Sequence, residues 1–589
     1  MTAHLADPEH NPSFTRGVFL GEIREDLIFP FPELEPADQE SLGAILHSFR
    51  SWAGDVVDSA RHDRQGRFDD AVRTGMAELG MMGLNIPEEY GGFGAPALLF
   101  SRVFAEVGTT DAALAVYFGA HQSIGCKGIT LFGTDDQKQR WLPRCASGEL
   151  IAAFCLTEAG SGSDAQAMRT TATPTIDGKH YLINGEKIWI SNAGYAGVFT
   201  VFAKVPVEAT NGKVKQRVTA FIVDAHAPGI TLGQVEDKMG IKASDTRTVS
   251  FENVRVPIED RLGEVGEGFR IALEILNSGR LGLAAGSARG ARNILDLALA
   301  YAAERKQFGR PIASFEIIQR KFALAAAECY AADAGWMICA AMVDRGGVDF
   351  SLETAACKVF ASELAFRATS EAQQIAGGLG YSREYPYEQA LRDCRIMLIF
   401  EGTNEILRAL IALSGMQQPG EKLQALGRAI RNPLGSLGAI GSHLTGRVKR
   451  QFVKPEFSQV HETLRDEAET VAKAIYRLAL AVDKLLVTHG KGVIERQFHQ
   501  ERLANAAIDI YLSSATLSRA TWAIKRAGGP KKAAADIQNA RIFVALAMRR
   551  TRRALRALER NQDEGLKALA DWALKNGTLT VETPTDARW

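Results

Sequence analysis

The order of three kinds of sequence pattern constrains the fold more than any other feature of this chain. Residues 36–150 repeat apolar residues at three- and four-residue spacing, as amphipathic helices do. Residues 151–257 change to strand-length apolar runs separated by turn residues, and helical spacing returns over residues 268–413. A strand-rich segment between two helical segments fits neither alternating βαβ units nor an all-β sandwich. We therefore expect a mainly α protein in which a central, β-barrel-like sheet domain separates two helical bundles.

The central segment contains one strong turn signal. Residues 180–183 and 187–190 have the length and apolar content of strands, and they flank Asn184 and Gly185. An Asn-Gly pair between two such runs is typical of a β-hairpin, because both residues tolerate positive φ. Further strands are predicted at residues 198–205, 218–223 and 246–254. The segment therefore predicts a mostly antiparallel sheet.

The overall composition excludes several classes of protein. The charge is balanced, with 69 basic and 69 acidic residues, so the chain as a whole is not built to coat nucleic acid. Its apolar runs are shorter than the roughly 20 residues that a membrane-spanning helix needs. Its seven cysteines include no C-x-x-C pair, which argues against a disulfide framework or a structural zinc site. We therefore expect no metal and a reducing, cytoplasmic environment.

The two ends of the chain predict segments outside this three-part core. Residues 1–35 begin with polar residues and prolines and lack the apolar centre of a secretory signal, so we expect a loose N-terminal tail. Residues 457–589 regain helical spacing and predict an extra C-terminal helical domain. The predicted domains between these ends are residues 36–152, 153–260 and 261–415.

Residues 416–456 predict a basic linker that is broken by glycine and proline. Within it, residues 423–455 contain six lysines and arginines, several apolar side chains and no acidic residue. Such a segment either docks its apolar residues on neighbouring helices or lies on an anionic membrane. A second basic cluster, at residues 541–560, predicts a helix surface that faces solvent or a second subunit.

The chain lacks the P-loop, nucleophile-elbow, zinc-protease and Rossmann motifs, so any large cofactor must bind to another fold. The Gly- and Ser-rich loop at residues 154–164 suits the approach of a phosphate, a carbonyl or a flavin edge, although such loops are more often plain turns. The indole of Trp189 either covers a flat heterocycle or fills the core. Glycines within residues 374–381 fit a helix C-cap or a cofactor contact.

Glu401 has the clearest catalytic potential. It follows the apolar run at residues 396–400 and precedes Gly402 and a new helix. Burial in an apolar pocket raises the pKa of a carboxyl group and makes it a stronger base near neutral pH. The alternative is a surface residue at a helix start, which the helix dipole favours. The residues around Glu401 leave both interpretations open.

Taken together, these motifs resemble the acyl-CoA dehydrogenase family over about residues 80–415. The likeness rests on the order of FCLTEAGSGSD, KIWIS, SDTR, LNSGR, ERKQFGRPI, QIAGGLGY and RDCRIMLIFEGTNEI. The C-terminal helical region extends it to the very-long-chain branch. The resemblance implies FAD-dependent oxidation of a long-chain fatty acyl-CoA to the trans-2-enoyl-CoA in β-oxidation, with Glu401 as the base that removes the α-proton. In some relatives the base lies on the earlier helix, where this chain has Gly279.

The resemblance also implies which residues bind the ligands. The residues implied to bind FAD are Phe154, Leu156, Thr157, Gly162, Ser163, Trp189, Ile190, Ser191, Arg305, Phe308, Gln319, Gln374, Ile375, Gly377, Gly378, Thr403 and Glu405. Arg305 and residues 374–378 are implied to reach this cofactor across a subunit interface. The residues implied to bind the acyl-CoA are Ser163, Asn277, Arg280 and Gly402.

The resemblance implies an electron-transfer flavoprotein as electron acceptor and a homodimer. It also implies peripheral contact with the inner face of an anionic membrane, which is the matrix side in a mitochondrion. Two other classes keep the same fold: a non-catalytic scaffold protein and a nucleic-acid-binding flavoprotein. The nucleic-acid class does not explain Glu401 within a complete site, so no nucleic-acid partner is expected.

Overall fold

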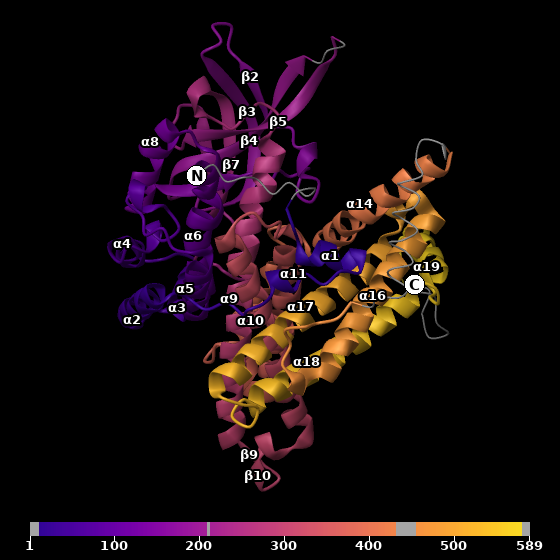
Figure 1. Cartoon of the computed structure of the whole chain (residues 1–589). Helices are drawn as coiled ribbons and strands as arrows, with labels where there is room; N and C mark the ends of the chain where they lie inside the picture. Colours follow the sequence, from indigo (N-terminus) through magenta and orange to yellow (C-terminus); the bar gives the residue numbers. More distant parts are fainter. Residues whose placement is uncertain (1–10, 209–211, 432–454, 580–589) are drawn as a thin grey trace, which may run out of the picture.

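The computed structural model describes residues 11–208, 212–431 and 455–579, apart from the side chains of residues 425–431. Three long helices run through the middle of the molecule: α9 (Gly268–Glu304), α10 (Glu316–Arg345) and α11 (Ser351–Ala376). A sheet domain lies above them in Figure 1, the N-terminal helices lie on one side and the C-terminal helices on the other. This arrangement confirms the predicted fold class. None of the helices described is long and apolar enough to cross a membrane.

The N-terminal domain is a set of helices whose apolar faces share one core. Its helices are α2 (Pro36–Val56), α3 (Ser59–Gln65), α4 (Asp70–Glu78), α5 (Ala97–Thr110), α6 (Ala112–Gly119), α7 (Lys127–Phe132) and α8 (Asp135–Ala146). Helix α8 begins at a capping box, in which Thr134 and Gln137 each accept a hydrogen bond from the other's backbone N–H. A π-helical turn at Ala120–Gly125 follows α6 and borders the cavity described below.

The middle domain is one eight-stranded sheet. Its strands are β1 (Ile151–Cys155), β2 (Thr171–Pro174), β3 (His180–Ser191), β4 (Ala196–Glu208), β5 (Val214–Asp224), β6 (Ile230–Val235), β7 (Thr246–Pro257) and β8 (Arg261–Leu262). They are ordered β6-β7-β3-β2-β4-β5-β8, and β1 pairs with β4. Most neighbours are antiparallel, as predicted, but β1 and β2 each pair with β4 in parallel. Strand β4 is therefore internal, and its first eight residues are buried on both faces.

The hairpin predicted at Asn184 and Gly185 is wrong. Strand β3 continues through both residues, and only an irregularity in its pairing with β7 marks them. Gly185 has a φ of 147°, and a Cβ atom there would lie 2.5 Å from Oγ1 of Thr170. The side-chain oxygen of Asn184 accepts a hydrogen bond from the N–H of Asn253 on β7. Pairing with β7 keeps β3 continuous through the Asn-Gly pair. The pair therefore forms a bulge instead of a turn, and the glycine allows the close approach of Thr170.

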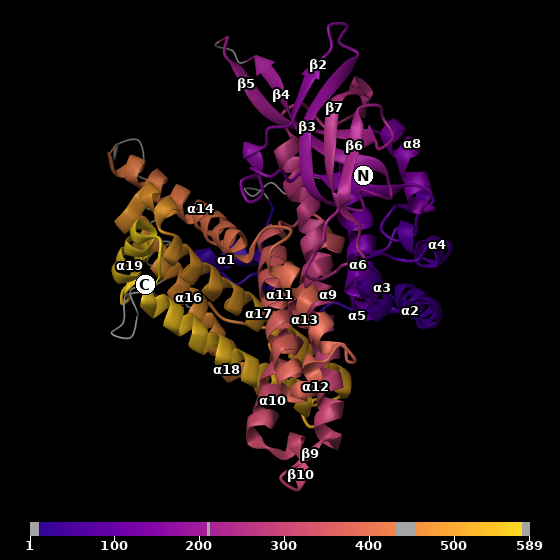
Figure 2. The same cartoon turned by 180° about the vertical axis from the view of Figure 1, so that it is seen from behind.

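Helix α9 contacts α5, α10 and α11 and so joins the N-terminal domain to the bundle. Ala284, Ala285 and Ala288 on α9 are fully buried, and their small side chains allow close packing. The hairpin of β9 (Lys306–Gln307) and β10 (Arg310–Pro311) follows α9 and projects at the lower end of Figure 1. Figure 2 shows α12 (Gly378–Tyr381) and α13 (Tyr387–Arg395) on the back of the bundle.

Helix α14 (Asn404–Arg431) corrects the first part of the predicted linker. The helix passes through Pro419 and Gly420, where the sequence predicts a break. Ile411, Ala412 and Met416 are buried in the shared core, and this packing outweighs the local cost of the proline. The rest of the predicted linker, residues 432–454, lies outside the described residues. The helices that follow are α16 (Arg465–His489), α17 (Gln497–Ala527), α18 (Ala534–Ala557) and α19 (Asp563–Asn576).

The predicted loose tail is wrong from Ser13 onward. Helix α1 (Phe14–Leu20) contacts α14, α16 and α17, and all its residues are buried. Figure 1 shows it among the C-terminal helices. The Ser13 hydroxyl donates to Oε1 of Glu353 on α11 (2.9 Å), and Arg16 forms a buried ion pair with Asp349 (2.7 Å). Seven helical residues are too few for a periodic pattern, which is why the sequence does not predict this docked helix.

We predict that Phe14→Ala lowers the free energy of unfolding by about 3–5 kcal/mol, because removal of a fully buried ring leaves a cavity. The ring lies 6.0 Å from that of Tyr511 on α17, centroid to centroid, so the cavity would form between α1 and the C-terminal helices. Denaturant unfolding measures the change. Ile176→Ala, at an exposed side chain, is the control and should change it by less than about 0.5 kcal/mol. Equal effects of the two substitutions would show that α1 is not part of the cooperative core.

Candidate active site

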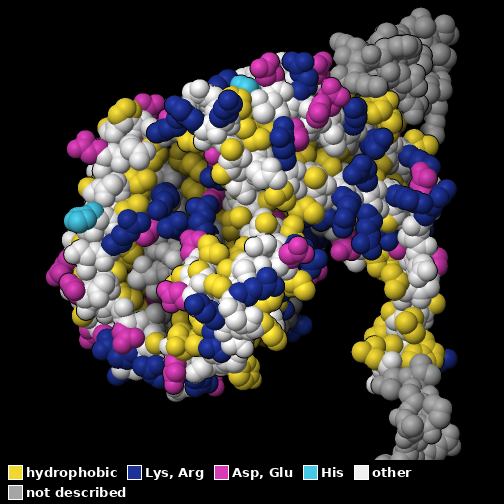
Figure 3. Space-filling view, turned by 90° about the horizontal axis from the view of Figure 1, so that it is seen from below, with side chains coloured by type: hydrophobic (Ala, Val, Ile, Leu, Met, Phe, Trp, Pro, Cys, Tyr) yellow, Lys and Arg dark blue, Asp and Glu magenta, His cyan; other side chains and the backbone are white. Residues whose placement is uncertain are grey.

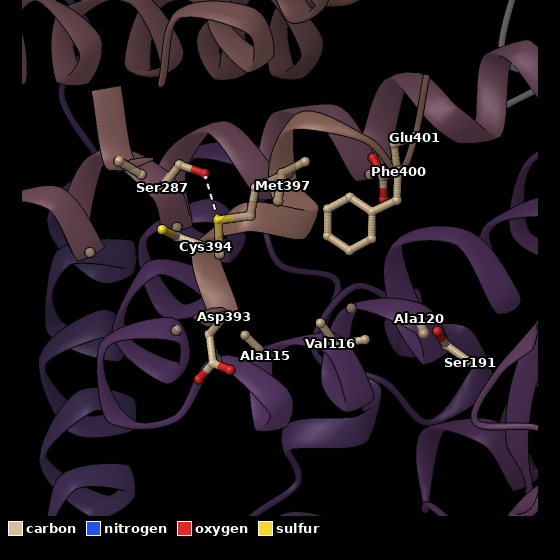
Figure 4. Close-up of a pocket in the computed structure, with 18 of the residues that line it drawn as sticks. Ala115, Val116, Ala120, Ser191, Ser287, Asp393, Cys394, Met397, Phe400 and Glu401 are labelled. Atoms are coloured by element: carbon tan, nitrogen blue, oxygen red, sulfur yellow. Dashed lines mark hydrogen bonds between the residues drawn. The ribbon is translucent and has the colours of Figure 1, made fainter. Parts of the chain in front are cut away.

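A cavity of about 870 Å³ lies between the N-terminal helices, the sheet and α9. Its walls come from α5, α6 and the π-helical turn, from the loop after β1, from the end of β3 and from the α13–α14 junction. Figure 4 shows Val116 and Ala120 on one side of it, Phe400 and Glu401 on another, and Ser191 at the end of β3. The volume is in the range of about 300–1,000 Å³ that small-molecule sites occupy.

Glu401 lies between the 3₁₀ turn at Ile396–Leu398 and α14. Its φ is 57°, which is uncommon outside glycine and is imposed by the surrounding structure, and the φ of Gly402 is 94°. Gly279 on α9 provides room for the side chain, because a Cβ atom there would collide with the Glu401 carboxylate. Oε2 of Glu401 is buried and has no hydrogen-bond partner among the described residues. The carboxylate is therefore held in the wall of the cavity with one oxygen unpaired.

The electrostatic environment places the titration of Glu401 near neutral pH. Burial raises the pKa of Glu401 to about 7, and the cationic side chains of Arg280 and Lys358 oppose this rise. Burial also lowers the pKa of Arg280 to about 10 and that of Lys358 to about 8, while the Glu401 carboxylate opposes both shifts. Glu401 is thus a buried group that can gain or lose a proton at physiological pH, not a surface residue at a helix start.

Arg280 holds the backbone at Glu401. Its Nε donates to the carbonyl oxygen of Glu401 (3.1 Å), and its Nη1 donates to Oδ1 of Asn277 (3.0 Å). Both Asn277 and Arg280 are buried, but only Arg280 borders the cavity. The structure therefore gives this pair a positioning role beside Glu401.

Lys358 on α11 holds the next residue, and sequence analysis misses it. Its Nζ donates to the carbonyl oxygen of Gly402 (2.9 Å) and to Oδ1 of Asn404 (2.8 Å). The side chain of Lys358 is fully buried. One feature of the sequence could have pointed to Lys358: it is the only charged residue in the apolar run at residues 355–360. An apolar run in a long helix is normally buried, and a buried lysine normally has a polar partner.

The loop after β1 and the end of β3 form another wall of the cavity. The indole of Trp189 is 63% exposed at a φ of 55°, which excludes the alternative of a core tryptophan. An exposed aromatic face beside hydroxyls and a Gly-rich loop suits a flat heterocycle with polar edges. The predicted residues that border the cavity are Phe154, Leu156, Thr157, Gly162, Ser163, Trp189, Ile190, Ser191, Arg280, Glu401 and Gly402.

A buried ion pair supports this wall and is also missed by sequence analysis. Nζ of Lys187 donates to Oε1 of Glu158 (2.8 Å) and to the carbonyl oxygen of Leu156 (3.1 Å). Oε1 of Glu158 also accepts hydrogen bonds from the N–H and the hydroxyl of Thr170. Because both charges are buried, each compensates the other. Lys187 precedes Trp189 by two residues, so the pair ties the loop to the strand that carries the indole.

Comparisons with known proteins identify the family. The chain is 44% identical over 519 residues to the mitochondrial very long-chain specific acyl-CoA dehydrogenase of Bos taurus, a match that covers 86% of this chain and 79% of the relative. The corresponding protein of Homo sapiens is 43% identical over 515 residues, with the same two coverages. This chain belongs to the acyl-CoA dehydrogenase family.

Family models and a solved structure agree with the assignment. The N-terminal, middle and C-terminal domain models of acyl-CoA dehydrogenase match residues 39–149, 153–254 and 266–416. The model described as ACAD9/ACADV, C-terminal domain, matches residues 462–579. A crystal structure of an acyl-CoA dehydrogenase complexed with FAD from Bacillus anthracis superposes with a TM-score of 0.79 at 30% identity, covering 98% of this chain and 96% of that chain. The likeness therefore extends beyond the three-part core to the C-terminal helices.

The other predicted ligand residues of this acyl-CoA dehydrogenase do not border the cavity. The ring of Phe308, near the β9–β10 hairpin, is 94% exposed at a φ of 52°. Gly377 caps α11 with a φ of 64°, as one of the two interpretations of the glycines expects. The lower face of the molecule in Figure 3 mixes basic, acidic and hydrophobic side chains. The residues outside the cavity are Asn277, Arg305, Phe308, Gln319, Gln374, Ile375, Gly377, Gly378, Thr403 and Glu405.

We predict that Lys358→Met lowers stability and raises the pKa of Glu401. Methionine leaves the carbonyl oxygen of Gly402 and the amide oxygen of Asn404 without this donor, at about 1–3 kcal/mol for each unpaired buried group. Loss of the nearby cation also removes an interaction that favours the ionised carboxylate. Denaturant unfolding measures the first effect, and a ¹³C NMR titration of labelled glutamate measures the second.

The matched control for this substitution is Lys567→Met on α19, where the lysine is exposed. It should leave both the stability and the titration of Glu401 unchanged, because an exposed lysine contributes little to either. A Glu401 pKa that is the same in Lys358→Met and in the parent protein would refute the electrostatic role of Lys358.

Proposed function

We propose that this chain oxidises long-chain fatty acyl-CoA thioesters to trans-2-enoyl-CoA, with FAD as hydride acceptor and Glu401 as the α-proton base. The observation that carries the proposal is the unpaired, buried Oε2 of Glu401 in a cavity that also presents the face of Trp189. A general base is most effective when its pKa lies near the working pH, and that of Glu401 is about 7. The relatives named above are acyl-CoA dehydrogenases, and one of them contains FAD.

The described residues fit a flavin. Trp189 offers a flat exposed face, and the hydroxyls of Thr157, Ser163 and Ser191 border the same cavity. A Cβ atom at Gly162 would find nothing within 4 Å, so a ligand can approach the backbone of this loop. When bound there, FAD supplies acceptance of a hydride equivalent, which no amino-acid side chain can provide.

Glu401 contributes both a side chain and a backbone group to the proposed reaction. Its ionised carboxylate takes the α-proton and becomes a neutral carboxyl, while the β-carbon loses a hydride equivalent and the Cα–Cβ bond becomes double. The N–H of Glu401 makes no hydrogen bond within the described parts of the chain, so it is free to polarise the thioester carbonyl. Arg280 and Lys358 hold the two carbonyl groups that follow this N–H, which fixes its direction. The apolar walls exclude water and strengthen these interactions.

The length of the cavity supports a long acyl chain. Its lining follows one face of α9 from Gly279 through Gly286 and Gly290 to Leu297. These ends are 18 residues apart, which corresponds to about 27 Å along a helix. Gly290 leaves open space on this face, because a Cβ atom there would meet nothing within 4 Å, whereas Gly279 and Gly286 make room for Glu401 and Phe104. The cavity therefore has the length of an extended long-chain acyl group rather than of a short one.

We further propose that this enzyme works as a homodimer and passes its electrons to an electron-transfer flavoprotein. Arg305 and Phe308 support the dimer, because they are exposed and do not border the cavity of their own chain, so a second subunit could receive them. The proposal that an electron-transfer flavoprotein is the electron acceptor is supported by the family relationship alone. Contact of residues 423–455 with an anionic membrane, on the matrix side in a mitochondrion, rests on their excess of positive charge and on their apolar side chains.

We predict that Glu401→Gln lowers kcat/KM with palmitoyl-CoA by at least about 10²–10⁴-fold while FAD stays bound, because glutamine cannot accept the α-proton. The parent enzyme should gain activity as the pH rises through about 7, since only the ionised form of Glu401 is a base. Steady-state rates with an artificial electron acceptor measure both effects, and flavin absorbance reports retention of the cofactor. Glu421→Gln on the distal part of α14 is the control and should match the parent. Full activity of Glu401→Gln would eliminate Glu401 as the base.

We predict that Gly290→Phe shortens the range of acyl chains that the enzyme accepts. A Cβ atom at Gly290 meets nothing within 4 Å, so the ring can enter the cavity without displacing the backbone. The kcat/KM for C16 to C20 acyl-CoA should fall by about tenfold or more, while that for butyryl-CoA stays within about twofold. Gly43→Phe, on the exposed side of α2, is the matched control. Equal losses for short and long chains would place the acyl group elsewhere.

A further inference from the structure

A second cavity, of about 610 Å³, forms a groove between α16 and α18 in the C-terminal domain. None of the residues that line it borders the cavity at Glu401. The groove therefore belongs to neither the proposed acyl-CoA site nor the proposed flavin site. Its volume is within the range of about 300–1,000 Å³ that small-molecule ligands occupy.

The groove is lined by five cationic side chains and one carboxylate. The two lysines have partners: Lys484 donates to Glu559 (2.6 Å), and Lys473 donates to Glu469 (3.0 Å). The other three cations are arginines that have no carboxylate partner among the described residues. These groove arginines are Arg477, Arg552 and Arg556. The net charge of the whole chain is zero, but the groove contains an excess of positive charge, which favours an anionic ligand.

The floor of the groove contains an unsatisfied hydroxyl. Thr551 is 1% exposed and lines the groove, and its Oγ1 has no hydrogen-bond partner in the part of the chain that the structure describes. An unpaired buried hydroxyl costs stability unless a ligand satisfies it. Arg552 and Arg556 are four residues apart and share one face of α18, and Thr551 lines the same groove as these two arginines.

Residues 423–455 of this chain are a poor occupant of the groove. Residues 423–455 carry six cations and no acid, so their charge has the same sign as that of the groove. Arg549 and Arg553 on α18 and Arg560 just after it do not line the groove, and they extend the positive field instead of neutralising it. A ligand that brings negative charge therefore fits the groove better than this basic segment does.

We propose that the groove between α16 and α18 binds a phosphate-bearing ligand, with the groove arginines on the phosphate oxygens and the Thr551 hydroxyl as an additional donor. Guanidinium groups pair with phosphate through two parallel hydrogen bonds, which makes arginine the preferred residue for such a site. A phospholipid headgroup and a free phosphate ester share this chemistry. The inference does not depend on the reaction proposed for Glu401.

The test is calorimetric titration of the full-length, FAD-loaded protein with inorganic pyrophosphate. We expect saturable binding to the parent, and binding that is about tenfold or more weaker when all three groove arginines are changed to glutamine. The matched control changes Arg549, Arg553 and Arg560 to glutamine, which removes the same charge from positions on α18 and just after it that do not line the groove. Equal weakening in both triple variants, or no saturable binding to the parent, would overturn the proposal.

Thr551→Val tests whether the floor of the groove is part of the site. Valine keeps the shape but removes the hydroxyl, so pyrophosphate should bind several-fold more weakly while Tm does not fall, because an unpaired buried hydroxyl is lost. Unchanged pyrophosphate affinity, or weaker affinity together with a lower Tm, would remove Thr551 from the site and reduce the groove to a charged surface.

Two further titrations distinguish the sources of phosphate. Vesicles that contain an anionic phospholipid should bind the parent more tightly than pyrophosphate does if the natural ligand is a lipid headgroup. Soluble coenzyme A should bind the parent more tightly than pyrophosphate does if the natural ligand is a free phosphate ester. Either result supports the site, provided that the groove arginines are required. Tighter binding of polyglutamate than of any phosphate probe would contradict it, because the groove would then recognise an acidic peptide.

Discussion

The burial of one carboxylate between two buried cations organises the centre of this enzyme. Glu401, Arg280 and Lys358 come from the α13–α14 junction, from α9 and from α11, so these segments must pack together before any of the charges is compensated. The two cations bond backbone carbonyls next to the carboxylate and leave Oε2 unpaired. A carboxylate with every acceptor position satisfied would be a weaker base, since hydrogen bonds to the charged form lower its pKa. The bundle thus stabilises the loop while leaving Oε2 of the proposed base without a hydrogen-bond partner among the described residues.

Helix α9 packs tightly on one face and borders the cavity on another, and small residues occur on both faces. Its buried alanines pack in the core, while Gly279, Gly286 and Gly290 face the cavity. Each glycine costs about 1 kcal/mol of helix propensity relative to alanine, a cost that packing on α5 and α11 offsets. Gly279 has an additional role, because any side chain there would displace the Glu401 carboxylate. The length of the cavity and the position of the proposed base therefore depend on the same helix.

The sequence predicts the parts of this structure that rest on local signals. Domain order follows from periodicity. The apolar run before Glu401 is compatible with a buried carboxyl but leaves a surface position open, and only the structure shows the burial that raises its pKa. The sequence does not predict features set by distant contacts. The asparagine before Gly185 predicts a turn. The structure has a bulge there, because β3 pairs with β7 on both sides of Gly185 and Thr170 packs against it. Likewise, Lys358 is recognisable only once its acceptors at Gly402 and Asn404 lie beside it.

Helix α11 connects the C-terminal domain to the proposed base. Near its start, Glu353 accepts a hydrogen bond from Ser13, which precedes the docked α1. Lys358, five residues further along, bonds the carbonyl of Gly402. Five residues correspond to about 7.5 Å along a helix, so the contacts that dock α1 and those that position the proposed base lie within two turns of α11. Because α1 docks on α14, α16 and α17, the C-terminal helices form a surface that the catalytic bundle needs for its own packing.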